Sequence, residues 1–84
     1  MKFGYTICDS ANMNVYRDAI QFIIEQLGYI PSNDELHDVD DSVWQTFQKG
    51  NAKLKLESNV QIDYVAIISD VELPIDCLHK WEVV

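Results

Sequence analysis

The chain has 84 residues, of which 48% are hydrophobic and 24% charged, and its formal net charge is −8. This composition is typical of a globular protein, and we expect residues 1–84 to form one domain with a small core and little room for a deep pocket. The negative charge repels nucleic acid and anionic lipid and attracts basic surfaces, so it argues against direct nucleic-acid binding and against a membrane partner.

The cysteine content and the N-terminal residues indicate a cellular location. Cys8 and Cys77 are the only cysteines, too few for a disulfide-stabilised scaffold. Residues 1–9 contain no apolar run like that of a signal peptide, and no part of the chain approaches the roughly 18 apolar residues of a membrane-spanning helix. We therefore expect a cytoplasmic protein with two free thiols.

The first predicted element is a strand over residues 2–8, in which apolar and polar or small side chains alternate. Asp9, Ser10 and Asn12 follow, and such residues cap helix N-termini by accepting hydrogen bonds from free backbone N–H groups. A helix over residues 13–27 is therefore expected, with Gly28 at its C-terminal end. Its apolar stripe needs burial under a sheet and consists of Tyr16, Ile20, Ile23, Ile24 and Leu27, widened by Val15, Ala19 and Phe22.

The middle of the chain is predicted to contain an acidic loop and a second, shorter helix. Residues 34–41 hold few apolar side chains and several carboxylates, which indicates a short turn or an exposed loop. Asp40 or Asp41 can cap a helix over residues 42–49. On that helix Val43, Trp44 and Phe47 would form one face, and residues 50–51 would end it.

The last part of the chain is predicted to form three strands. Residues 52–57 alternate as a one-sided antiparallel strand, and residues 58–59 suit a hairpin turn. Residues 60–69 become continuously apolar, as in a central strand buried on both faces. Residues 70–76 read as a loop and residues 77–83 as a last strand. The order is β-α-α-β-β-β, which predicts an α+β fold with the helices packed on one face of a largely antiparallel sheet.

No pattern of residues indicates catalysis or a cofactor. The G-x-S-x-G, G-x-G-x-x-G and Walker motifs are absent. A calcium loop counted from Asp38 would place Val43 where glycine is needed and Lys49 where a bidentate glutamate is needed. We therefore predict no catalytic residue, no metal site and no cofactor.

The acidic residues form two stretches without Lys or Arg, and these stretches carry the functional hypothesis. Carboxylates on a rigid surface can take the place of nucleic-acid phosphates, so the expected partner is a basic protein such as a nuclease or another nucleic-acid-binding protein. Phage-encoded inhibitors of host defence and toxin-neutralising immunity proteins share this size and charge. Trp44 would be the aromatic anchor, although its spacing also fits the core. The predicted partner-binding residues are Asp34, Glu35, Asp38, Asp40, Asp41, Trp44, Asp63, Asp70, Glu72 and Asp76.

Three alternatives remain open at this stage. The acidic surface can serve solubility alone. The protein can be a structural or assembly module, such as a homodimer that pairs through its last strand. It can also be a small enzyme that uses Cys8, His79 or a carboxylate-bound metal, or that holds zinc where Cys8, Cys77 and His79 converge, although the compact ligand pairs of zinc sites are missing.

Overall fold

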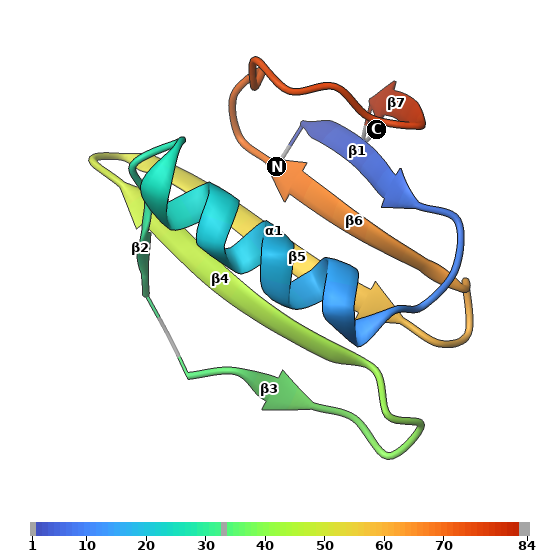
Figure 1. Ribbon diagram of the computed structural model, residues 1–84. Coiled ribbons are helices and arrows are strands. Elements are labelled where there is room, and N and C mark those ends of the chain that lie inside the picture. The colour runs from blue at the N-terminus through green and yellow to red at the C-terminus, as the bar shows by residue number, and fades with distance from the viewer. Residues whose placement is uncertain (1, 33, 83–84) are drawn as a thin grey trace.

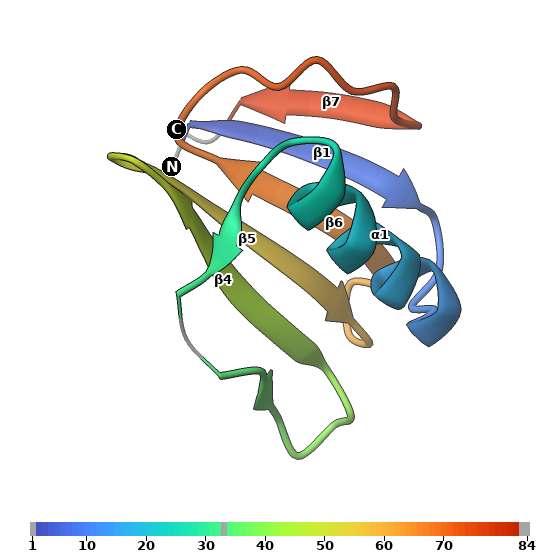
Figure 2. The ribbon, with the colours of Figure 1, turned by 60° about the vertical axis from the view of Figure 1, so that its left-hand side comes forward.

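The computed structural model describes residues 2–32 and 34–82, which form one antiparallel sheet covered on one face by a helix (Figures 1 and 2). The strand order is β2-β4-β5-β6-β1-β7, and β3 pairs with β4 along the same outer edge as β2. The predicted α+β class is confirmed, with one helix among these residues. The elements are β1 (Phe3–Cys8), α1 (Met13–Glu25), β2 (Ile30–Pro31), β3 (Leu36–His37), β4 (Val43–Lys49), β5 (Ala52–Asn59), β6 (Tyr64–Ser69) and β7 (His79–Glu82).

Helix α1 begins where its capping residue predicts. The Asn12 side-chain oxygen accepts hydrogen bonds from the backbone N–H groups of Asn14 and Val15, at 2.9 and 3.2 Å. The helix ends two residues before the predicted position, and Gly28 follows with φ +77°, a left-handed conformation that glycine adopts without strain. Part of the predicted stripe lies against the sheet, where Tyr16, Ala19 and Ile23 are buried, but Phe22 and Ile24 of that stripe are exposed.

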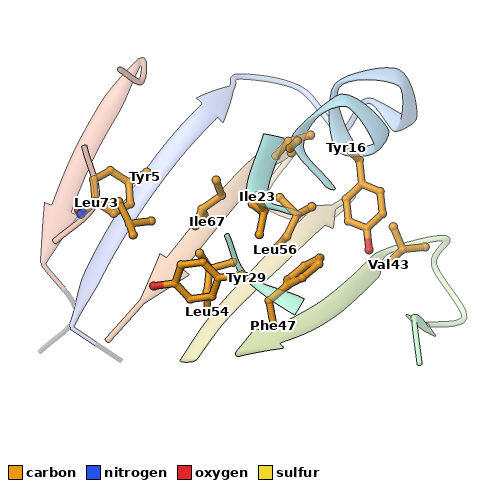
Figure 3. Close-up of a cluster of buried hydrophobic side chains, with 12 residues drawn as sticks. Tyr5, Tyr16, Ile23, Tyr29, Val43, Phe47, Leu54, Leu56, Ile67 and Leu73 are labelled. Atoms are coloured by element: carbon orange, nitrogen blue, oxygen red, sulfur yellow. The ribbon is translucent and has the colours of Figure 1, made fainter. Parts of the chain in front are cut away.

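The core lies between α1 and the sheet face beneath it. Leu54 and Leu56 of β5 and Ile67 of β6 lie under the helix and are fully buried (Figure 3). Because these positions are closely packed, a Leu→Ala change at such a site costs about 2–5 kcal/mol of folding free energy. The other face of the sheet carries no second layer of described residues. The full core cluster is Tyr5, Tyr16, Ala19, Ile23, Tyr29, Val43, Phe47, Leu54, Leu56, Val65, Ile67 and Leu73.

The predicted second helix over residues 42–49 is wrong, because this segment forms strand β4. Val43 and Phe47 point to the core, whereas Trp44 points to the opposite face, as the strand alternation requires. Aromatic and β-branched side chains favour a strand once a neighbouring strand is present, and β5 supplies that neighbour. Gly50, with φ +60°, then forms the tight turn into β5 instead of ending a helix.

The hairpin between β5 and β6 turns later than predicted. Residues 58–59 belong to β5, and residues 60–63, which the alternation placed in the central strand, form the turn. The Asn59 side chain accepts a hydrogen bond from the Ile62 N–H at 2.9 Å, and Asp63 adopts φ +64°. Strand β6 is nonetheless an interior strand, since Val65, Ala66 and Ile67 are at most 1% exposed.

The last strand lies at the sheet edge next to β1. It begins at His79, so Cys77 precedes it, and the predicted Val83 lies outside the described residues. The Trp81 ring lies directly over Gly4 of β1, where an added Cβ would be only 2.3 Å from the ring atoms. The Trp81 indole N–H also donates to Thr6 Oγ1 at 3.3 Å. Residues 70–76 form a loop as predicted.

Candidate functional site

Three segments that are distant in sequence meet at one end of the sheet. They follow β1, precede β4 and join β5 to β6, so the antiparallel topology places them together, on the right in Figure 1. The Ala11 N–H donates to Asp63 Oδ1 at 2.8 Å, and the Val60 N–H donates to Ser42 Oγ at 2.9 Å. We call residues 9–12, 38–42 and 60–63 the acidic end. They contain no Lys or Arg, and their carboxylates belong to Asp9, Asp38, Asp40, Asp41 and Asp63.

The loop over residues 38–42 is held in one conformation by its own side chains. The Val39 N–H donates to Asp38 Oδ1 at 2.7 Å, and the Ser42 N–H donates to Asp40 Oδ1 at 3.0 Å. The Asp38 N–H closes the loop by donating to the Ser42 carbonyl at 2.8 Å. Hydrogen bonds from Ser42 hold the pKa of the Asp40 carboxyl below its ordinary value. The loop therefore holds the Asp38 and Asp40 carboxylates against its own backbone.

Among the residues that the structure describes, no cation forms an ion pair with a carboxylate of the acidic end. Within residues 2–32 and 34–82, the ion pairs join Glu35 to His37 at 3.0 Å, Glu57 to Lys55 at 3.7 Å and Glu72 to Lys80 at 2.7 Å. None of these pairs includes a carboxylate of the acidic end. Asp9, Asp38, Asp41 and Asp63 are exposed to the solvent, and Asp40 is partly exposed.

The structure divides the ten predicted site residues among different places. Asp38, Asp40, Asp41 and Asp63 belong to the acidic end. Asp34 and Glu35 lie between β2 and β3 along the outer edge, where the charge of Glu35 adds to burial in raising the pKa of the Tyr16 hydroxyl.

Three further predicted residues, in addition to Asp34 and Glu35, lie outside the acidic end. Asp70 follows β6 at the opposite end, where its side chain accepts a hydrogen bond from the Lys53 N–H at 3.1 Å. Glu72 pairs with Lys80, which holds the pKa of the Glu72 carboxyl below its ordinary value. Asp76 lies in the loop beside α1. Of the second predicted acidic stretch, Asp63 therefore lies with the first stretch, whereas Asp70, Glu72 and Asp76 do not.

Trp44 lies on the sheet face opposite α1, close to the acidic end. It is not a core residue, unlike Val43 and Phe47 in the same strand. The Lys55 ammonium lies 5.8 Å from the centre of the Trp44 ring, and Leu36 of β3, which pairs with Trp44, is 49% exposed. Trp44 thus offers a half-buried aromatic surface with an exposed aliphatic neighbour.

Tyr64 forms a second aromatic position on the same face, directly after Asp63. Its hydroxyl donates to Glu57 Oε1 at 2.7 Å, and Glu57 is nearly buried. Burial, together with the Glu57 charge, raises the pKa of the Tyr64 hydroxyl, so Tyr64 remains a neutral donor. The nearly buried Glu57 carboxylate therefore has a hydrogen-bond donor within the protein.

Sequence reasoning missed Asp9, Leu36 and Tyr64 as members of this region. Asp9 was read only as a helix cap, and the structure uses Asn12 for that purpose. One feature of the sequence could have placed Asp9 near Asp63: Asp9 directly follows one predicted strand, and Asp63 directly precedes the apolar run of another. In an antiparallel pair these positions are neighbours, as the Ala11 to Asp63 hydrogen bond shows.

The described residues contain no group of three or more His, Cys, Asp or Glu side chains that could hold a metal ion. Both cysteines are free thiols, and Cys8 Sγ lies 3.7 Å from Ser10 Oγ. Helix α1, the one helix in residues 2–32 and 34–82, lacks the length to cross a lipid bilayer. Comparison of the chain with protein-family models, with curated proteins and with solved structures finds no match.

Proposed function

We propose that this protein is a small acidic binding protein that inhibits a basic partner by occupying its nucleic-acid-binding surface. The observation that supports this proposal is the acidic end, where five carboxylates from three segments lie without a cationic partner. A nuclease or a defence effector binds phosphates through Lys and Arg, and fixed carboxylates can satisfy the same cations. The role would be that of a phage anti-defence protein or an immunity protein.

The aromatic face beside the acidic end supports a specific contact rather than a diffuse electrostatic one. Stable interfaces depend on a few well-packed anchors, which are most often Trp, Tyr or Arg. Trp44 and Tyr64 are half-buried on a sheet face that no described layer covers, and Leu36 extends the apolar surface. A basic partner could therefore place cations at the acidic end and apolar side chains or Arg over the rings.

Affinity capture from host cytoplasm, followed by competition with nucleic acid, tests this proposal. The captured protein should dissociate as NaCl rises from about 0.05 to 0.5 M, because salt screens exposed charges. It should bind nucleic acid by itself and lose that binding when this protein is added. A captured protein that binds nucleic acid and this protein at the same time would contradict the proposal.

A homodimer is the second candidate, because β7 lies at the sheet edge with unpaired backbone groups on one side. An antiparallel pair of β7 strands that places Trp81 opposite its copy would also place Lys80 opposite Glu82. In that arrangement Asp9 would lie at the end of the strand next to β7, whereas residues 38–42 would lie four strands from it. Light scattering at increasing protein concentration tests it: a monomer at about 0.5 mM would exclude the dimer, and Lys80→Glu should weaken a real one.

A further inference from the structure

A groove lies on the helix side of the sheet, between α1 and the segment that joins β6 to β7. Its volume is about 490 Å³, within the roughly 300–1,000 Å³ that ligand pockets occupy. The apolar lining comes from four elements: Val15 and Phe22 belong to α1, Ile7 to β1, Ile67 to β6 and Ile75 to the joining segment. Phe22 is 38% exposed, although it lies on the wall of an apolar hollow.

The groove continues along the helix beyond this first hollow. A second hollow of about 390 Å³ begins at Pro74, which lines both, and extends to Leu27 and Val71. Val71 is 43% exposed. Apolar surface is therefore present in two neighbouring hollows beside α1, which share Pro74, and the second hollow is also lined by the charged residues Lys49 and Glu72.

The charges around the first hollow are of one sign. Asp18 lines it from α1 and Asp76 lines it from the joining segment, so the two carboxylates come from opposite walls. Both side chains are exposed, and neither belongs to an ion pair within residues 2–32 and 34–82. No Lys or Arg lines this hollow. An apolar floor with carboxylates on both walls is complementary to an apolar group that carries a nearby cation.

We propose that this groove is a docking site for a polypeptide segment in which an apolar side chain lies next to a Lys or Arg. The apolar side chain would replace water on Phe22 and Ile75, and the cation would lie between Asp18 and Asp76. The two neighbouring hollows favour a polypeptide, which can place a side chain in each, over a compact ligand. The site lies on the helix face and uses no residue of the acidic end, so it stands or fails independently of the inhibitory function.

A displayed library of random 12-residue peptides, selected against the purified protein, tests the proposal. The enriched peptides should combine an apolar residue with Lys or Arg. A synthetic copy of an enriched peptide should shift the backbone amide resonances of Val15, Phe22 and Ile75 in the ¹⁵N-labelled protein. Failure of the selection to enrich any such pattern would overturn the proposal.

Two double variants with the same change of charge separate the groove from the acidic end. The peptide should bind Asp18→Lys/Asp76→Lys at least about 10-fold more weakly than wild type, because two attractive charges become repulsive. It should bind Asp9→Lys/Asp38→Lys within about 3-fold of wild type. Equal losses in both variants would show attraction to net charge alone and would overturn the site.

The apolar part of the site needs its own variant. Phe22→Ser changes a partly exposed side chain, so the fold should remain, which circular dichroism and the amide spectrum can verify. Peptide affinity should fall by about 5-fold or more because the apolar contact is lost. Unchanged affinity would show that the peptide does not use the groove. Partner inhibition that persists in Phe22→Ser would leave the inhibitory function intact, so the two proposals fail separately.

Discussion

The two ends of the sheet use acidic residues in different ways. At the acidic end, the carboxylates of Asp38, Asp40 and Asp63 accept hydrogen bonds from nearby backbone N–H groups, which orient them without neutralising their charge. At the opposite end, Asp70 binds the backbone of Lys53, and Glu72 forms an ion pair with Lys80.

The two ends of the sheet also differ in their basic residues. The segments that meet at the opposite end, residues 2–3, 49–53 and 69–72, contain Lys2, Lys49 and Lys53, whereas the acidic end has no base. Lys49 acts structurally there: its ammonium donates to the Leu27 carbonyl at 2.9 Å beyond the end of α1. Five of the 14 acidic side chains thus gather at one end with no Lys or Arg among them, which gives that end the stronger negative field.

Charge reversal at each end should produce the largest difference. Asp9→Lys/Asp38→Lys should weaken binding of the basic partner on the order of 100-fold, because like charges would face each other across the interface. Glu25→Lys/Glu82→Lys makes the same change of net charge at exposed positions towards the other end of the sheet and should alter the dissociation constant by less than about 3-fold. Isothermal titration calorimetry can measure both. Similar losses in the two variants would show that binding depends on the net charge of the protein and not on the location of the charges at the acidic end.

Gly4→Ala should reduce stability more than the other variants of this comparison. Gly4 lies in β1, next to the edge strand β7 and towards the opposite end of the sheet. The new Cβ would overlap the Trp81 ring, so β7 would have to move off β1. We expect a loss of about 1–3 kcal/mol in the free energy of unfolding, measured by urea denaturation. Gly4→Ala combined with Trp81→Ala should be less unstable than the sum of the single changes. Strict additivity would contradict the contact.

Lys49→Met should reduce stability by a smaller amount. It removes the hydrogen bond to the Leu27 carbonyl and the ammonium that lies 6.0 Å from the centre of the Tyr29 ring. The expected loss is about 0.5–1.5 kcal/mol. Lys53→Met makes the same charge change on the neighbouring strand and is the control, with little expected effect. Equal losses would indicate that only the removed charge matters.

The smallest effects should appear in the dependence of stability on pH. The lowered pKa of Asp40 means that its hydrogen bond stabilises the fold above about pH 3.8, and that this contribution is lost as pH falls through the lower folded pKa. The pKa of Glu72 is lowered as well, so its ion pair with Lys80 stabilises the fold above about pH 4.5, and this stabilisation is lost as the pH falls. The stability difference between wild type and Asp40→Asn should therefore disappear in acid, as should that for Glu72→Gln.

Added salt should separate these two carboxylates. The Glu72 contribution should shrink in about 0.5 M NaCl, because it comes from an exposed ion pair. The Asp40 contribution should persist, because its partner is a backbone N–H. Urea denaturation from pH 7 to pH 2.5 at two salt concentrations measures both. An Asp40 contribution as sensitive to salt as that of Glu72 would contradict the assignment of the cause.

Local patterns in the sequence determined much of the fold. The Asn12 cap, the apolar spacing of residues 13–27 and Gly28 located α1 to within two residues. The alternation of residues 2–8 and the apolar run after Tyr64 located β1 and β6. These features depend on interactions between residues close in the chain, which are present in the sequence itself. The acidic composition was likewise evident, but the prediction of a loop over residues 34–41 missed strand β3, which pairs with β4.

Tertiary structure alone decided the features that depend on a neighbour. Val43, Trp44 and Phe47 fit one face of a helix by spacing, and only pairing with β5 makes them a strand with Trp44 on the open face. The separation of the acidic residues into two ends is also invisible in sequence, because it depends on which strand ends the antiparallel pairing brings together. The number of charges is a property of composition, but their usable arrangement is a property of the sheet.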